Sequence, residues 1–196
     1  MTEKKLFSKK SIIIAIIVVA VLWIGGAYNS LVKLDENTKA AFANVEAQLQ
    51  RRFDLIPNLQ SIVEGAANFE KSTFVEVTQA RTQWLNASSI DQKIAAANQM
   101  EGALARLLVT LENYPQLQAT QGFRDFQVQL EGTENRIATE RIRYNKVATE
   151  YNKRVRTFPS SLIAKLFGFH RHELFKAEKE AEKAPKIDFS FSAPQQ

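Results

Sequence analysis

The feature that most constrains this chain is an uninterrupted apolar run near its amino terminus. From Ile12 to Ala27 the sequence holds sixteen residues without a charge, an amide or a hydroxyl. A helix rises about 1.5 Å per residue, so residues 11–28 would extend roughly 27 Å, close to the ~30 Å hydrocarbon core of a bilayer. The run predicts a transmembrane helix over residues 12–28, an anchor that includes Ile12, Ile16, Val19, Leu22 and Trp23.

Basic residues precede this run and set its expected orientation. The segment of residues 1–11 carries Lys4, Lys5, Lys9 and Lys10 against a single acidic residue. Because Lys and Arg are enriched on the cytoplasmic side of membrane helices, we expect residues 1–11 to be a basic cytoplasmic tail. The main domain is then extracytoplasmic, and the protein is expected to be a single-pass protein of the cell (inner) membrane. Membrane lipid is therefore one expected partner.

A cleaved secretory signal is the alternative for the same run. Small residues at Gly25 and Ala27 resemble a signal peptidase site. The apolar core of a signal usually spans about 7–15 residues, and this run is at the long end. A helix-compatible sequence also continues past it without a break, so retention as an anchor is favoured.

Composition narrows the class of protein. The chain has no cysteine, which excludes disulfides, thiolate chemistry and cysteine-based metal sites. The formal net charge is +5, but residues 1–11 supply four Lys and one Glu, or +3, which leaves +2 for the rest. With the main domain outside the cytoplasm, no nucleic-acid partner is expected. Gly and Pro number only seven and five, too few for a strand-rich fold.

Apolar residues recur at helical spacing along residues 29–158. The first stripe, from Leu31 to Val63, predicts a long helix that continues the membrane span, with a kink at Pro57. It is expected to end near Gly65, and a second helix, capped by Asn68, to carry the stripe from Phe69 to Trp84. A third helix follows the capping-box pattern of Ser89 and Gln92.

The fourth stripe is the clearest, with eleven positions at strict three-four spacing from Phe123 to Phe158. It predicts a packed helix about 54 Å long. The expected fold is therefore all-α: an amino-terminal transmembrane helix that continues into an up-and-down four-helix bundle of long antiparallel helices, residues 29–158.

Seven polar or amphipathic residues in and beside this fourth stripe form a candidate polar network. The dipeptide Tyr144-Asn145 recurs seven residues later as Tyr151-Asn152, which places both pairs on one helix face. One interpretation is a partly buried network that satisfies carboxylates of the first helix, such as Glu46 or Asp54. The other is a surface ladder for a partner helix. The candidate residues are Thr133, Glu134, Arg141, Tyr144, Asn145, Tyr151 and Asn152.

Two further segments follow the bundle. Residues 159–175 are apolar and basic, and with the end of the fourth helix they predict contact with an anionic membrane surface, although a solvated charged face is the alternative. Residues 176–196 are expected to be a flexible, charged tail, in which Ile187, Phe189 and Phe191 alternate with the period of a strand that adds to a partner. The candidate membrane-surface residues are Arg154, Arg156, Lys165, Leu166, Phe167 and Phe169.

Catalytic motifs are scarce. The only histidines, His170 and His172, are two residues apart and on a helix would point away from each other, so no metal site or other cofactor is predicted. No glycine-rich phosphate loop is present. The alternative to a non-enzyme is an accessory of an envelope hydrolase or peptidase, with a polar site built from Glu131, Glu134 or Glu140 and Arg141.

Several blocks resemble the LemA family of bacterial membrane proteins. The resemblance covers nearly all of residues 28–175 and implies a single-pass protein with an up-and-down helical bundle. It implies no catalytic residues. The blocks are 48–59 (QLQRRFDLIPNL), 77–81 (VTQAR), 112–117 (ENYPQL), 130–137 (LEGTENRI), 144–159 (YNKVATEYNKRVRTFP) and 166–169 (LFGF).

The predicted function is a membrane-anchored helical interaction or scaffold protein of the bacterial envelope, without an assigned reaction. Long apolar seams and the strand-like tail suggest a homo-oligomer, and an envelope protein is a possible further partner.

Overall fold

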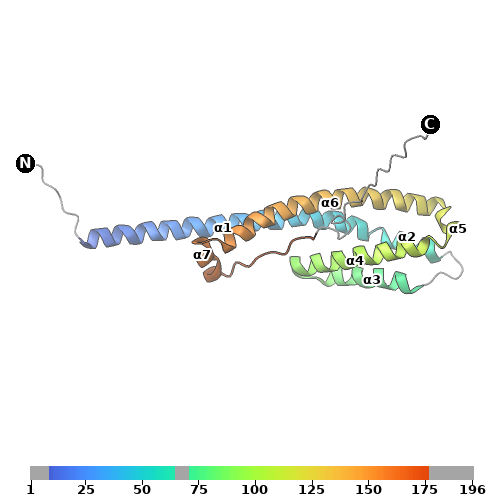
Figure 1. The fold of residues 1–196 in the computed structure, drawn as a ribbon, viewed down its shortest axis with the longest axis horizontal. Coiled ribbons are helices and arrows are strands. Elements are labelled where there is room, and N and C mark those ends of the chain that lie inside the picture. The colour runs from blue at the N-terminus through green and yellow to red at the C-terminus, as the bar shows by residue number, and fades with distance from the viewer. Residues whose placement is uncertain (1–8, 65–70, 177–196) are drawn as a thin grey trace, which may run out of the picture.

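The structure, a computed structural model, describes residues 9–64 and 71–176. All regular elements in these residues are helices, and the longer ones run side by side beyond the first part of α1 (Figure 1). This confirms the all-α prediction. The helices are α1 (Lys9–Phe53), α2 (Ile56–Glu64), α3 (Lys71–Asn86), α4 (Ile90–Leu111), α5 (Pro115–Gln118), α6 (Gln121–Arg156) and α7 (Ser160–Phe167).

Helix α1 has two parts with different surroundings. Every residue from 9 to 26 is exposed, and the first buried side chain is Ala27, followed by Leu31. Beyond that point a stripe at helical spacing, which includes Phe42, Val45 and Leu49, is buried in the bundle. By length and hydropathy α1 is the one helix within the described residues that can cross a membrane. The helix continues from the apolar run into the bundle without interruption, as predicted.

Pro57 explains where α1 ends. A proline ring collides with the carbonyl group four residues earlier, which here belongs to Phe53, the last residue of α1. The chain tightens at this point, where the Leu55 amide donates to the Arg52 carbonyl oxygen over 3.1 Å. Pro57 then lies in the first turn of α2, where its missing N–H group costs nothing. The predicted kink is thus a short break between two helices.

Helices α3 and α4 form an antiparallel hairpin that packs beside α1 and α2 (Figure 1). The predicted capping box at the start of α4 is present, since the Ser89 side chain accepts from the Gln92 amide and the Gln92 side chain accepts from the Ser89 amide. The hairpin contributes Trp84, whose ring meets that of Phe53 edge-on at 5.0 Å, and Met100 to the core. The proposed cap at Asn68 lies outside the described residues.

Helix α6 returns along α1 in the opposite direction. Thr120 caps its amino terminus by accepting from the Phe123 amide. Its buried residues include Phe126, Ile137 and Tyr144, which face the core formed with α1 and α4. The long stretches α1–α2, α3, α4 and α6 therefore form the predicted up-and-down bundle, and each fully buried large side chain stabilises it by about 1.5–3 kcal/mol.

One position of the fourth stripe differs from the prediction. Helix α6 ends at Arg156, and the backbone of Thr157 is already extended. Phe158, expected at the end of the seam, is consequently 76% exposed. After this turn α7 packs against both α1 and α6, and Gly168 ends it in the left-handed conformation at φ 74°, which favours glycine.

Candidate interaction site: the strap and its clamp

An extended segment, residues 169–176, leaves α7 and lies along the bundle, and we call it the strap. Two asparagines of α6, Asn145 and Asn152, bind its backbone through both ends of their amide groups, and with Tyr144 and Tyr151 of the same helix they form what we call the clamp. Asn152 donates to the His172 carbonyl oxygen (2.8 Å) and accepts from the His172 amide (3.0 Å). Asn145 binds Phe175 in the same way, at 2.8 and 2.9 Å. These contacts involve only the strap's main chain, so they recognise extended conformation rather than sequence.

The spacing of these contacts follows from helix and strand geometry. Asn145 and Asn152 are seven residues apart, so they are separated by about 10.5 Å along α6. His172 and Phe175 are three residues apart, and an extended chain covers about 10 Å over that length. The spacing of the two asparagines along α6 therefore matches the spacing of their two partners along the strap, which runs antiparallel to α6. Helix α1 shows the same interval, since His172 contacts Asp35 and Phe175 contacts Phe42.

Phe175 fastens the distal end of the strap in the core. Its side chain is 4% exposed and stacks against Phe42, with ring centroids 6.4 Å apart. The Tyr144 ring meets it edge-on at 5.6 Å, and the Arg141 guanidinium lies over its face at 4.9 Å. Tyr144 also donates its hydroxyl to the Glu173 carbonyl oxygen over 2.7 Å. An aromatic side chain is therefore required at this position of the strap.

A polar cluster holds the proximal end. The Asp35 carboxylate lies 2.8 Å from His172 Nε2 and 2.8 Å from the Lys39 ammonium group. Burial alone would raise the pKa of Asp35, but hydrogen bonds from Lys39 and His172 outweigh it, so the pKa lies below its ordinary value. The hydrogen bond to Asp35 in turn raises the pKa of Lys39.

The two tyrosines of the clamp remain protonated hydrogen-bond donors at neutral pH. Burial raises the pKa of Tyr151 to about 12, with a further contribution from the charge of Asp35. Burial also raises the pKa of Tyr144, together with the charges of Asp91 and Glu173. The centroid of the Tyr151 ring lies 5.0 Å from that of the His172 ring, so Tyr151 packs against this end of the strap.

The remaining members of the candidate polar network take part in two ion pairs of the bundle, and one of them, Arg141, also lies over the Phe175 ring. Arg52 of α1, 3% exposed, pairs with Glu134 and contacts the Thr133 hydroxyl. Arg141 pairs at 2.9 Å with Glu101 of α4. The seven candidate residues are therefore divided between the clamp and these two ion pairs.

The prediction that carboxylates of the first helix would pair with this network was wrong for the two residues named. Glu46 pairs with Lys93 of α4, and Asp54 accepts from Gln50 of its own helix. Arg52, which the sequence analysis did not single out, supplies the contact from α1 instead.

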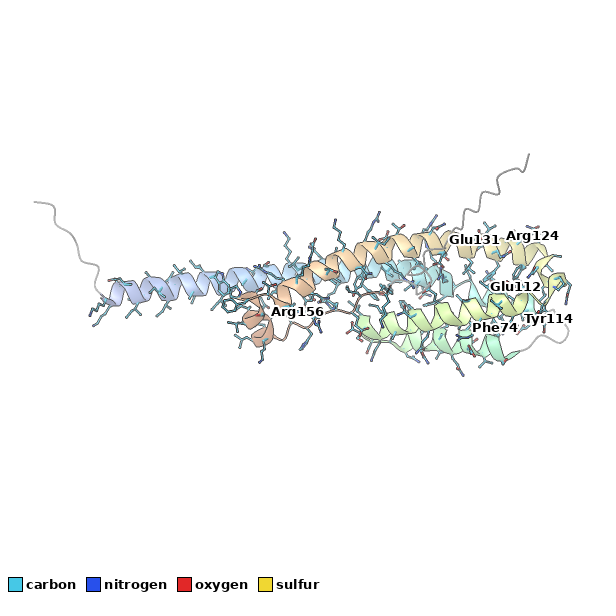
Figure 2. The ribbon with its side chains drawn as sticks, viewed as in Figure 1. Phe74, Glu112, Tyr114, Arg124, Glu131 and Arg156 are labelled. Atoms are coloured by element: carbon cyan, nitrogen blue, oxygen red, sulfur yellow. The ribbon has the colours of Figure 1, made fainter. Side chains whose placement is uncertain are left out.

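The carboxylates considered for a hydrolytic site do not converge. Glu134 pairs with Arg52, and Glu140 pairs with Arg143 one helical turn away. Glu131 is an exposed residue in the amino-terminal half of α6 (Figure 2). Among the described residues no group of three His, Asp or Glu side chains is placed to hold a metal ion. The best-formed polar site is the clamp, whose chemistry is the binding of an extended chain.

The candidate membrane-surface residues gather near α7. Arg154 and Arg156 are exposed in the last turn of α6, where Figure 2 shows Arg156 beside α7. Lys165 and Leu166 are exposed on α7. The rings of Phe167 and Phe169 lie 4.8 and 5.8 Å from the ring of Tyr28, at the predicted membrane exit of α1. The tail residues Ile187, Phe189 and Phe191 lie outside the described residues.

Sequence reasoning missed the strap. It assigned residues 159–175 to one amphipathic segment, whereas the chain forms a short helix followed by an extended stretch. The available signal was the Tyr-Asn repeat, because amides seven residues apart on a helix match every third residue of an extended chain.

The fold and the site define a class: a membrane-associated helical protein whose long apolar helix continues into a bundle that binds the strap. Comparison with known proteins agrees with this class. The model of the LemA family matches residues 41–189, and the chain belongs to that family.

Individual relatives extend over most of the chain. It is 30% identical over 186 residues to magnetosome protein MamQ 2 of Paramagnetospirillum magneticum, with 82% of this chain and 68% of that protein covered. It is 28% identical over 186 residues to magnetosome protein MamQ of Magnetospirillum gryphiswaldense, with the same coverage. It is also 24% identical over 156 residues to protein LemA of Metamycoplasma hominis, with 79% of this chain and 71% of that protein covered.

We expect Asn145→Asp and Asn152→Asp to loosen the strap, because a carboxylate cannot donate to the Phe175 or His172 carbonyl oxygen. Each variant loses a partly buried hydrogen bond worth about 1 kcal/mol, so the amides of residues 172–175 should exchange with solvent roughly fivefold faster. Hydrogen-deuterium exchange of the full chain in detergent measures this. The control is Asn135→Asp, an exposed asparagine of the same helix. Unchanged exchange in both clamp variants would contradict the clamp.

The lowered pKa of Asp35 predicts a pH-dependent contribution to stability. Because the folded state favours the ionised carboxylate, this contribution is present above the ordinary pKa of 3.8 and is lost as pH falls through the lower folded-state value. Asp35→Asn should therefore lower the melting temperature at about pH 6, and the difference from the parent chain should shrink towards about pH 3. Asp125→Asn, at an exposed position of α6, is the control. A difference that grows on acidification would refute the assignment.

Proposed function

We propose that this chain is a single-pass interaction protein of the bacterial envelope, with its amino terminus in the cytoplasm and its bundle outside. The supporting observation is the division of α1, whose residues 9–26 are all exposed and apolar after the first turn, while residues beyond Ala27 pack into the bundle. Such an exposed apolar helix is unfavourable in water and favourable in a bilayer.

The proposed orientation depends on charge. Lys9 and Lys10 lie at the start of α1, directly before the apolar residues, and two more lysines precede them in the sequence. The opposite end of the span is followed by a mixed set of charges, including Lys33, Asp35 and Glu36. This asymmetry favours a cytoplasmic amino terminus, and thus an inner-membrane protein with an extracytoplasmic bundle.

We assign the protein an interaction role rather than a reaction. Glu134 and Glu101 are engaged in separate ion pairs, and the clamp binds main-chain groups. The clamp also holds the last described residues on the bundle, since Phe175 packs at the level of Phe42, about 20 Å along α1 from Tyr28. From there the alternating residues Ile187, Phe189 and Phe191 would be presented to an envelope partner, for instance as an added strand.

Self-association is the second part of the proposal. The apolar seam of α6 that first suggested it is buried within the chain, against α1. Self-association is supported instead by other apolar side chains that are exposed and that a second copy could cover. They include Val109 of α4 and Val128 and Ile142 of α6, which are 63%, 69% and 71% exposed.

The orientation predicts which single cysteines a membrane-impermeant maleimide reaches in intact cells. The chain has no cysteine of its own, so each introduced thiol is unique. Ile142→Cys on the bundle should label once the reagent passes the outer permeability barrier. Thr2→Cys should label only after the inner membrane is opened. The reverse pattern would overturn the topology, and labelling of both positions without permeabilisation would indicate that the anchor does not span.

Self-association predicts a mass at least twice 22.2 kDa for the protein component of detergent-solubilised particles. Size-exclusion chromatography with light scattering, corrected for bound detergent, gives this mass. If the outward residues of α6 form the contact, Val128→Glu with Ile142→Glu should return the particle to a monomer without changing its helical circular dichroism. A monomer across the accessible concentration range in the parent chain would remove this part of the proposal.

A further inference from the structure

Helix α7 lies where the anchor helix changes its surroundings. Its buried residues Ile163 and Ala164 pack on Ala27 and Leu31, the first buried residues of α1. The aromatic contacts of Tyr28 with Phe167 and Phe169 belong to the same junction. If residues 12–28 of α1 cross the bilayer, α7 is therefore held at the level of the lipid headgroups on the bundle side.

The outer side of α7 is apolar and largely exposed, although the Phe167 ring also contacts Tyr28 at its edge. Leu162 is 60% exposed, Leu166 is 75% exposed and Phe167 is 51% exposed. Leu162 and Leu166 are four residues apart, so they share one helix face. Phe158, in the turn just before α7, adds a ring that is 76% exposed. Together these four side chains form a surface we call the apolar foot.

Cationic residues lie near the apolar foot. Lys165 is exposed on α7 between the apolar residues, Arg156 lies beside α7 at the end of α6 (Figure 2), and Arg154 is exposed in the same last turn. Apolar side chains bordered by Lys and Arg are the combination that binds the interface of an anionic bilayer, where acyl chains take up the apolar face and phosphates pair with the cations.

We propose that the apolar foot inserts into the bilayer interface beside the anchor, and that its partner is an anionic lipid surface. The inference depends on the proposed membrane-spanning anchor and extends it, because it makes α7 a second, peripheral membrane contact of the same chain. Two features favour lipid over a protein occupant: the foot is continuous with the apolar surface of α1, and its flanking charges have the sign that complements phospholipid headgroups.

The test measures the depth of single nitroxide labels on the full chain. The cysteine-free chain permits one label at a time, at Leu162→Cys, Leu166→Cys, Val19→Cys or Ile142→Cys. The labelled chains are reconstituted into vesicles of phosphatidylcholine and phosphatidylglycerol. Oxygen, which partitions into the membrane, and a water-soluble nickel chelate then compete as relaxing agents.

The expected result is a ratio of oxygen to nickel accessibility that is high at 19, intermediate at 162 and 166, and low at 142. The label at Ile142 is the matched control, because that residue is an equally exposed apolar side chain, 71%, on the bundle. A ratio at 166 equal to that at 142 would overturn the insertion of α7 while the anchor stands. A low ratio at 19 as well would overturn the proposed anchor itself.

Other occupants give different signals. A second copy of the chain would broaden the spectrum at 166 as the ratio of protein to lipid rises, without a gain in oxygen accessibility, and this would also overturn the proposal. The charge contribution has its own control pair on α6: Arg156→Glu should reduce the oxygen-to-nickel ratio at 166 on anionic vesicles, whereas Arg136→Glu, equally exposed but about 30 Å away along the helix, should leave it unchanged.

Discussion

One continuous helix determines how the rest of this protein is arranged. Helix α1 exposes the apolar residues of its first half and packs its second half into the bundle, and the change falls at Ala27 without a break in the helix. Helix α6 packs along the second half, and α7 packs where the two halves meet. The position of every other element relative to the membrane therefore follows from the register of α1.

Two kinds of contact hold the strap: one recognises its main chain and the other recognises a side chain. Asparagine amides on α6 bind its main chain and require only that it be extended. The aromatic cluster of Phe42, Tyr144 and Phe175 requires a particular side chain at one place. Buried amides that lose these partners would be costly, so the strap and the face of α6 that it covers are expected to stay together.

The helices were predictable from sequence because their apolar residues repeat with the period of the structure they form. The capping box of Ser89 and the break at Pro57 were also readable, since both depend on local chemistry. The ion-pair partners were not, because spacing along one helix does not specify which face of a neighbour it meets; Arg141 meets Glu101 of α4 rather than a residue of α1. The strap has no periodicity of its own, and only its binding residues on α6 carried a pattern.

The uninterrupted course of α1 also has a mechanical consequence. A helix without a hinge acts as a lever, so a tilt of its membrane half moves the far end of the bundle. From Tyr28 to Phe53 the arm is about 38 Å, and a ten-degree tilt would displace its tip by roughly 7 Å. Helix α7 packs against α1 at Ala27 and Leu31, where the tilting and the bundle-bound parts of α1 meet. Changes in bilayer thickness, which alter the tilt of membrane helices, would thus be converted into sideways movement of the bundle.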